Sequence, residues 1–153
     1  MISQRNSRLK RLYKYILAPV AQCIVLIIRL LSPLVVVRFA ALDSYRIGSL
    51  AMLTELYLCR RQAGLYKKNS FDFFFYDTLP VSNYQLNKMW KRLLLTVNLP
   101  NLMPLVVRLN RAFPGYKKHE IKLDSFLADP VNLHTIYPTH LAFLPDEKNR
   151  GKD

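Results

Sequence analysis

The sequence is poor in acidic residues and in cysteine, and no uncharged apolar run reaches the length of a membrane span. Ten Asp and Glu side chains stand against 23 Lys and Arg, which gives a net charge of +13 at neutral pH. Such a surface attracts phosphates, nucleic acid or an anionic membrane leaflet. The two cysteines, Cys23 and Cys59, do not make a disulfide framework, which favours a reducing compartment.

Motifs for nucleotides, nucleic acids and metals are also missing from the sequence. There is no G-x-G-x-x-G, no P-loop, and no RNA-binding or zinc-finger signature. The basic residues are scattered rather than set in a recognised reading element, which argues against nucleic acid as a partner. His119, His134 and His140 lack the i,i+4 spacing of a helical metal pair, and no cysteine is near them in the sequence. We therefore expect no metal site and no cofactor.

An uncharged apolar run covers residues 15–28 and follows a basic stretch. It is short for a spanning helix, which needs about 20 apolar residues. Arg29 interrupts it, and the lack of a clean small-x-small cleavage site argues against a signal peptide. Helical spacing of the apolar residues predicts a basic amphipathic helix at about residues 8–31. This helix lies either in a membrane interface or against its own domain or a further part of the chain. The apolar stripe comprises Leu9, Leu12, Tyr13, Ile16, Leu17, Val20, Ile24, Ile27 and Leu31.

The next segments alternate between strand and helix patterns. Residues 33–42 predict a buried strand, because they are short, β-branched and almost continuously apolar. A helix is expected from about Ser49 to Ala63, with Gly64 as its left-handed cap. An aromatic strand at residues 71–77 follows. This order predicts an α/β fold with a parallel sheet.

Two more helices and two weak strand candidates complete the pattern. Ser82 and Gln85 form a capping box before an apolar stripe, and Asn101 is the expected cap of the next helix. The segments "HEIKL" and "HLAFL" are short strand candidates. A complete doubly wound domain would offer more strands than these, so we expect a partial domain within a larger protein.

The turn "DSYRIGS", residues 43–49, is the main candidate for a ligand site. Ligands of open α/β sheets bind beyond the carboxyl ends of the strands, where the next helix presents free N–H groups. Gly48 would allow close backbone approach, and Arg46 could grip a phosphate or carboxylate. Asp77 ends the second strand and is a further pocket candidate. The alternative is a structural turn glycine beside a surface arginine.

Two blocks, "RIGSLAMLTELYLCRR" and "NYQLNKMWKR", resemble the N-terminal part of bacterial glycosyltransferases from surface-polysaccharide gene clusters. The family pattern runs R-I-G-H-L-A, then N-T-E-L-Y-L after one residue, and later N-x-Q-L-x-K-M-W-K-R. The similarity touches most of the chain after residue 35. The matching residues are Arg46, Ile47, Gly48, Leu50, Ala51, Thr54, Glu55, Leu56, Tyr57 and Leu58, then Asn83, Gln85, Leu86, Lys88, Met89, Trp90, Lys91 and Arg92.

The resemblance implies a partial Rossmann-like, GT-B-like N-terminal domain, with the sugar donor held mainly by a second domain. It also implies substrate-binding roles for Arg46, Gly48 and Ser49, and it makes Glu55 a candidate base or hydroxyl partner. The other interpretation of Glu55 is a solvated helix acid paired with an arginine. Ser49 stands where the family pattern has histidine, and Leu53 where it has asparagine. Serine cannot replace a histidine base near neutral pH, so we expect no sugar transfer by this chain alone.

Two functions remain open at this point. The first is the acceptor-side part of a glycosyltransferase on the cytoplasmic face of the cell membrane, with a nucleotide-sugar donor and a lipid-linked or polysaccharide acceptor. The second is a non-catalytic basic module that binds an anionic membrane surface or another polyanion. The expected division is a basic, apolar helix at 1–32, the Rossmann-like domain at 33–145, and a link to a second domain at 146–153.

Overall fold

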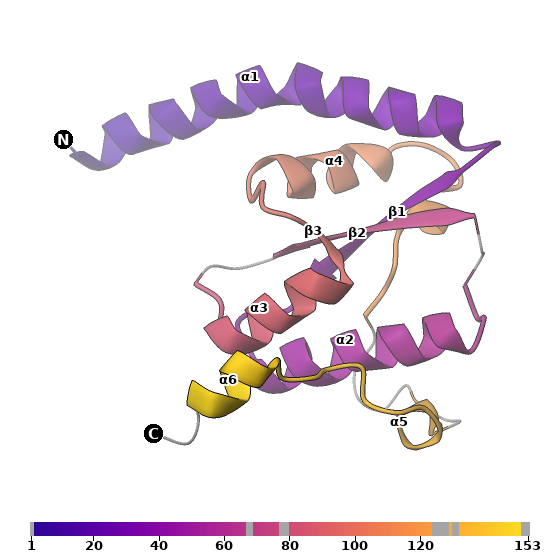
Figure 1. The fold of residues 1–153 in the computed structure, drawn as a ribbon. Coiled ribbons are helices and arrows are strands. Elements are labelled where there is room, and N and C mark those ends of the chain that lie inside the picture. Colours follow the sequence, from indigo (N-terminus) through magenta and orange to yellow (C-terminus); the bar gives the residue numbers. More distant parts are fainter. Residues whose placement is uncertain (1, 67–68, 77–79, 124–128, 130–131, 151–153) are drawn as a thin grey trace.

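The computed structural model describes residues 2–66, 69–76, 80–123, 129 and 132–150, with side chains between residues 16 and 148. It is an α/β structure, as the sequence predicts (Figure 1). The elements in chain order are α1 (Ile2–Leu31), β1 (Val36–Leu42), α2 (Ile47–Gln62), β2 (Ser70–Tyr76), α3 (Tyr84–Leu93), β3 (Leu95–Val97), α4 (Leu102–Asn110), the 3₁₀ helix η1 (Tyr116–His119), α5 (Leu133–Ile136) and α6 (Pro145–Arg150).

The three strands form one parallel sheet in the order β1-β2-β3. Glu120, from the "HEIKL" segment, adds a single parallel bridge beside Phe39 on the free edge of β1. The sequence did not predict β3, and residues 140–144 form an irregular loop instead of the expected strand. The parallel arrangement brings the carboxyl ends of all three strands to one edge of the sheet.

Helices cover both faces of the sheet and make three layers. In Figure 1, α1 and α4 lie above the sheet, and α2 and α3 lie below it. Successive strand residues point to opposite faces, so neighbouring side chains enter different cores. The upper core joins Phe39 and Phe75 to Val25 of α1, whereas the lower core joins Phe74 to Trp90 of α3.

Helix α1 confirms the helix expected near residues 8–31, and it is apolar on two faces. Its inner face packs on the sheet and α4 through Ala21, Val25 and Ile28. At its C-terminal end, Arg29 donates hydrogen bonds from Nη1 to the Pro114 carbonyl at 2.8 Å and from Nε to an oxygen of the α4 residue Asn110 at 3.0 Å. The C-terminal half of α1 is therefore part of the domain core.

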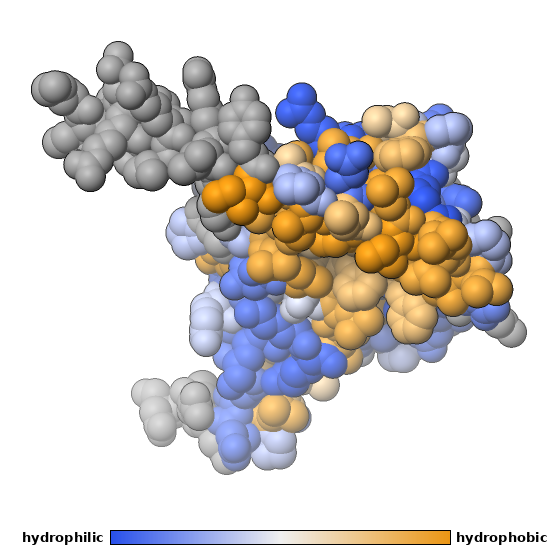
Figure 2. All heavy atoms as spheres, turned by 90° about the horizontal axis from the view of Figure 1, so that it is seen from above, coloured by the Kyte–Doolittle hydropathy of each residue, from blue (hydrophilic) through white to orange (hydrophobic). Residues whose placement is uncertain are grey.

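Much of the stripe indicated by the sequence faces outward instead. Figure 2, which views the molecule from the α1 side, shows a hydrophobic band along this face. No helix in the described ranges is long and apolar enough to cross a bilayer. We call this band the outer stripe of α1; its exposed side chains are Ile16, Val20, Leu26, Ile27, Leu30 and Leu31.

Two helix ends test the capping predictions. Gly64 adopts the left-handed conformation with φ of 73°, and its N–H bonds the Arg61 carbonyl at 3.1 Å, which confirms the expected end of α2. The Ser82 cap is wrong by one residue. Asn83 caps α3 instead, because its side-chain oxygen accepts the Leu86 N–H at 2.8 Å.

A buried ion pair joins β1 to β2 near the amino ends of these strands. Arg38 lies directly opposite Asp72 and donates from Nε and Nη2 to its two carboxylate oxygens, each at 2.7 Å. The Tyr57 hydroxyl donates to the same carboxylate, and the Tyr66 ring lies 4.5 Å from the guanidinium carbon of Arg38. Asp72 is therefore part of a buried hydrogen-bond network inside the domain. It lies at the end of the sheet opposite the candidate ligand site.

Candidate ligand-binding pocket

The connection from β1 to α2 places the predicted turn at the mouth of a cavity. β1 ends at Leu42 and α2 begins at Ile47, with Arg46 as its N-cap residue. A cavity of about 830 Å³ opens here and continues along α2. Its lining residues are Asp43, Arg46, Gly48, Ser49, Ala51, Met52, Leu53, Glu55, Leu123, Thr139 and Leu141.

The loops that follow β1 and β2 are tied together at this edge of the sheet. The Ser82 N–H donates to the Ser44 carbonyl at 2.8 Å, and Ser44 is fully buried. This contact fixes the β1–α2 connection against the segment that leads into α3. The turn is thus held at the carboxyl edge of the parallel sheet, where such folds bind ligands.

The sequence candidates Arg46, Gly48 and Ser49 all line this cavity. Arg46 is exposed and makes no side-chain capping bond to α2, so its guanidinium remains available for other contacts near the helix start. Gly48 is the second residue of α2, and an added Cβ there would meet no atom of the described residues within 4 Å. Packing therefore does not require glycine at this position. Asp43 lines the same cavity, and its carboxylate would repel any anion bound beside Arg46.

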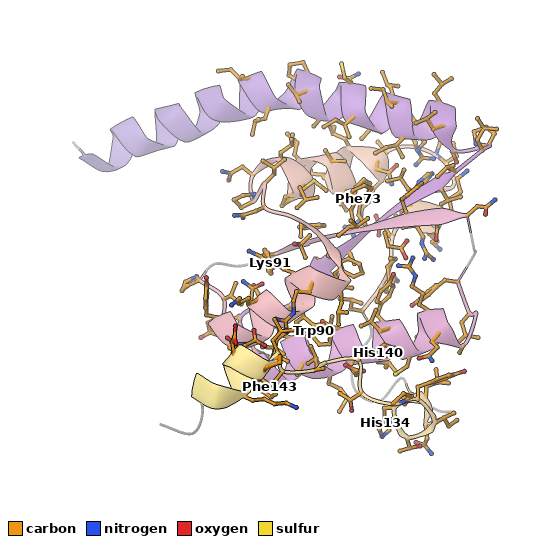
Figure 3. All side chains as sticks on the ribbon, viewed as in Figure 1. Phe73, Trp90, Lys91, His134, His140 and Phe143 are labelled. Atoms are coloured by element: carbon orange, nitrogen blue, oxygen red, sulfur yellow. The ribbon has the colours of Figure 1, made fainter. Side chains whose placement is uncertain are left out.

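Glu55 also lines this cavity, two turns further along α2. Its Oε1 lies 2.7 Å from both the backbone nitrogen and Nδ1 of His140. The partner is a histidine from a distant loop, not the arginine that the solvated-acid interpretation expected. Figure 3 shows His140 beside α2, whereas His134 lies further away on α5. Asp77, the remaining sequence candidate, lies outside the described residues.

Cys59 lies one turn beyond Glu55 on the same side of α2 and was missed by sequence reasoning. The ligand atoms of Glu55, Cys59 and His140 all lie within 4.8 Å of one another. No cysteine is close to a histidine in the sequence, but the fold brings Cys59 close to His140. The available signal was the i,i+4 spacing of Glu55 and Cys59. The partner histidine, 85 residues after Glu55, could not be chosen from sequence alone.

The other conspicuous side chains belong to the core. His119 is fully buried, and its Nδ1 lies 2.7 Å from the Val37 carbonyl. Burial lowers the pKa of His119, so the ring is kept neutral. Trp90 is fully buried between α3 and α2, as expected for a packing residue (Figure 3).

The pocket combines Arg46 and Asp43 near its mouth, apolar walls and the Glu55 carboxylate at its inner end. A guanidinium with the first N–H groups of a helix suits an anionic group, while a carboxylate accepts hydrogen bonds from hydroxyls. The arrangement suits an elongated ligand with an anion at one end and hydroxyls at the other. No protein-family model matches this sequence, and no curated protein or solved structure matches it either.

Proposed function

We propose that this chain is the acceptor-side domain of a glycosyltransferase-like protein of cell-surface polysaccharide synthesis, held on the inner face of the cell membrane. The observation that carries the proposal is the cavity that begins at the N-terminus of α2, beyond the carboxyl end of β1. The parallel sheet covered on both faces is compatible with a partial Rossmann-like, GT-B-like domain. A second domain would hold the nucleotide-sugar donor, as the resemblance implies.

The charged residues at the two ends of the cavity support a mode of binding for a lipid-linked or polysaccharide acceptor. Arg46 and the N–H groups of the first turn of α2 would hold a phosphate. Glu55 would accept a hydrogen bond from a sugar hydroxyl at the inner end. Ser49 supplies no imidazole, so the chain binds the acceptor but does not deprotonate it through this position.

Titration with a short polyprenyl phosphate tests the cavity, with the matching alcohol as the uncharged comparison. One charge-assisted contact contributes about 1.5–3 kcal/mol, so Arg46→Ala should weaken phosphate binding by roughly ten- to a hundred-fold. Arg46→Lys should restore only part of that loss, because lysine lacks the guanidinium fork. Arg108→Ala, an exposed arginine on α4, is the charge-matched control and should leave binding unchanged. If Arg46→Ala and Arg108→Ala weaken phosphate binding equally, the phosphate is attracted by the overall positive charge and not by a specific site at Arg46.

The second candidate function is a non-catalytic basic module on an anionic membrane. It is favoured by the outer stripe of α1, which exposes several large apolar side chains on a chain of net charge +13. Such a helix can lie in the membrane interface, and each basic residue near an anionic leaflet contributes about 1 kcal/mol.

Vesicle flotation tests this surface with neutral and anionic lipid mixtures. We expect binding to be stronger on anionic vesicles and to be lost in an Ile27→Asp, Leu30→Asp variant. The double variant Ile136→Asp, Phe143→Asp adds the same two charges at exposed apolar positions outside α1 and should retain binding. Membrane binding without phosphate binding in the cavity would favour the basic module over the glycosyltransferase-like domain.

A further inference from the structure

One side of α2 carries a second cluster of donor atoms beyond the mouth of the pocket. Glu55, Cys59 and Gln62 follow one another at i, i+4 and i+7, so they project from the same side of the helix. His140 lies across this side from the loop after α5. The cluster therefore joins two segments that are distant in the chain.

Each of the two ring nitrogens of His140 lies within hydrogen-bonding distance of a side-chain oxygen. Nδ1 lies 2.7 Å from Glu55 Oε1, and Nε2 lies 3.1 Å from Gln62 Oε1. A neutral imidazole has one N–H and can donate to only one of them. When Nε2–H donates to Gln62, the lone pair of Nδ1 faces the carboxylate, and a shared cation removes that repulsion. Metal-binding histidines commonly donate their other N–H to an oxygen in this way.

Two further donor atoms of the cluster are buried. Glu55 Oε2 is buried, and no described residue forms a hydrogen bond with it. Cys59 is a free cysteine and is only 1% exposed. A cation at this point would compensate the carboxylate and stabilise the thiolate.

We propose that Glu55, Cys59 and His140 form a Zn²⁺ site. Thiolate, imidazole and carboxylate are the donors that Zn²⁺ uses in proteins, and three protein ligands leave a fourth position for water. Binding replaces the Cys59 thiol proton with the Cys59 Sγ–Zn bond, so this proton is released to solvent. Gln62 would orient the His140 ring. Glu55 lines the inner end of the cavity but Cys59 and His140 do not line it, so the ion would sit beside this end of the cavity and not within it.

Titration of the chelator-treated protein with Zn²⁺, against a chromophoric chelator, tests the site directly. We expect one ion per chain, and we expect Co²⁺ to give thiolate-to-metal charge-transfer absorption. Cys59→Ser should abolish that absorption and weaken Zn²⁺ binding by at least a hundred-fold. Gln62→Ala should weaken it by roughly ten- to a hundred-fold, as loss of a partner behind a metal ligand usually does. Cys23→Ser changes an exposed cysteine on α1 and is the matched control, with no expected effect.

His140→Gln provides a second test, because His140 is at a partly exposed loop position where substitution leaves the core intact. It should also abolish tight Zn²⁺ binding, while circular dichroism remains that of the original protein. Zn²⁺ affinity unchanged by Cys59→Ser and by His140→Gln would overturn the proposal and leave Glu55 and His140 as a hydrogen-bonded pair only. These measurements do not use the acceptor phosphate, so a failure of the metal site can be distinguished from a failure of the proposed function.

Discussion

Replacing Asp72 with alanine should be among the most damaging single changes in this domain. The side chain of Asp72 is 1% exposed, and its two oxygens accept both hydrogen bonds from Arg38 and a further one from Tyr57. Removing the carboxylate leaves the Arg38 charge buried without compensation, which typically costs about 3–5 kcal/mol. A domain of this size has a total stability of roughly 5–15 kcal/mol, so the loss is a large fraction of it.

Urea unfolding followed by the fluorescence of Trp90 measures this cost, because Trp90 is the single tryptophan and is fully buried. With a urea slope of about 1–3 kcal/mol per molar, Asp72→Ala should lower the midpoint by roughly 1–5 M. Asp146→Ala removes an exposed acid and should change the midpoint little. A cost below about 1 kcal/mol for Asp72→Ala would refute the reasoning.

A double replacement separates the cost of an unpaired charge from the value of the pair itself. Exchanging a buried ion pair for apolar residues of similar volume is often neutral or stabilising. The variant with Arg38→Met and Asp72→Leu should therefore be more stable than Asp72→Ala alone. If the double variant is the less stable one, packing around the pair and not its charge balance determines the loss.

Three further predictions concern pH and the docking of helices. Burial lowers the pKa of His119 in the folded state, so below about pH 6.5 the unfolded chain binds more protons than the folded one. The free energy of unfolding should therefore decrease as the pH falls below this value. Urea unfolding at several pH values should show a weaker pH dependence for His119→Gln. Arg92 lowers the pKa of Glu147 to about 2, so the docking of α6 should be complete above pH 4.5 and be lost as pH falls toward 2, which amide exchange in α6 would report. Glu147→Gln should remove that pH dependence. Arg29→Ala should destabilise the domain by about 1.5–3 kcal/mol in urea, because it removes charged hydrogen bonds between α1 and the end of α4; no change would show that α1 is held by its apolar face alone.

The parallel sheet could be predicted because its first two strands are nearly continuous apolar runs, which is how buried parallel strands read. β3 could not, since Leu95–Val97 is three residues long and directly follows α3, where the apolar helix pattern continues into it. The cap of α3 was placed one residue early because Ser82 and Asn83 are both good capping residues, and only the backbone decides between them. Local patterns thus identified the longer elements, but they missed β3 and placed the start of α3 one residue early.

The pocket mouth could be predicted because Arg46, Gly48 and Ser49 are neighbours in sequence at a strand-to-helix turn. The inner end could not, because it depends on where a distant loop crosses α2. His140 reaches Glu55 across 85 residues, and no periodicity in the sequence encodes that contact. The outer stripe of α1 shows the same limit. Helical spacing identified all of its residues except Leu26 and Leu30. It did not identify the inner face, because the position of the sheet and α4 determines which residues of α1 point inward.

The inner packing of α1 has a consequence for any encounter with a bilayer. A helix that shares side chains with the sheet cannot swing out as a detachable anchor without opening the upper core. The whole domain would therefore settle on lipid as one rigid body, with the α1 axis along the membrane plane and α2 on the far side of the sheet. Two packed layers, each roughly 10 Å deep, would then separate the headgroups from the cavity. A phosphate at the surface of the same bilayer would then lie about 20 Å from the cavity, so the phosphate held by Arg46 would belong to a molecule in solution or to the outer part of an extended acceptor.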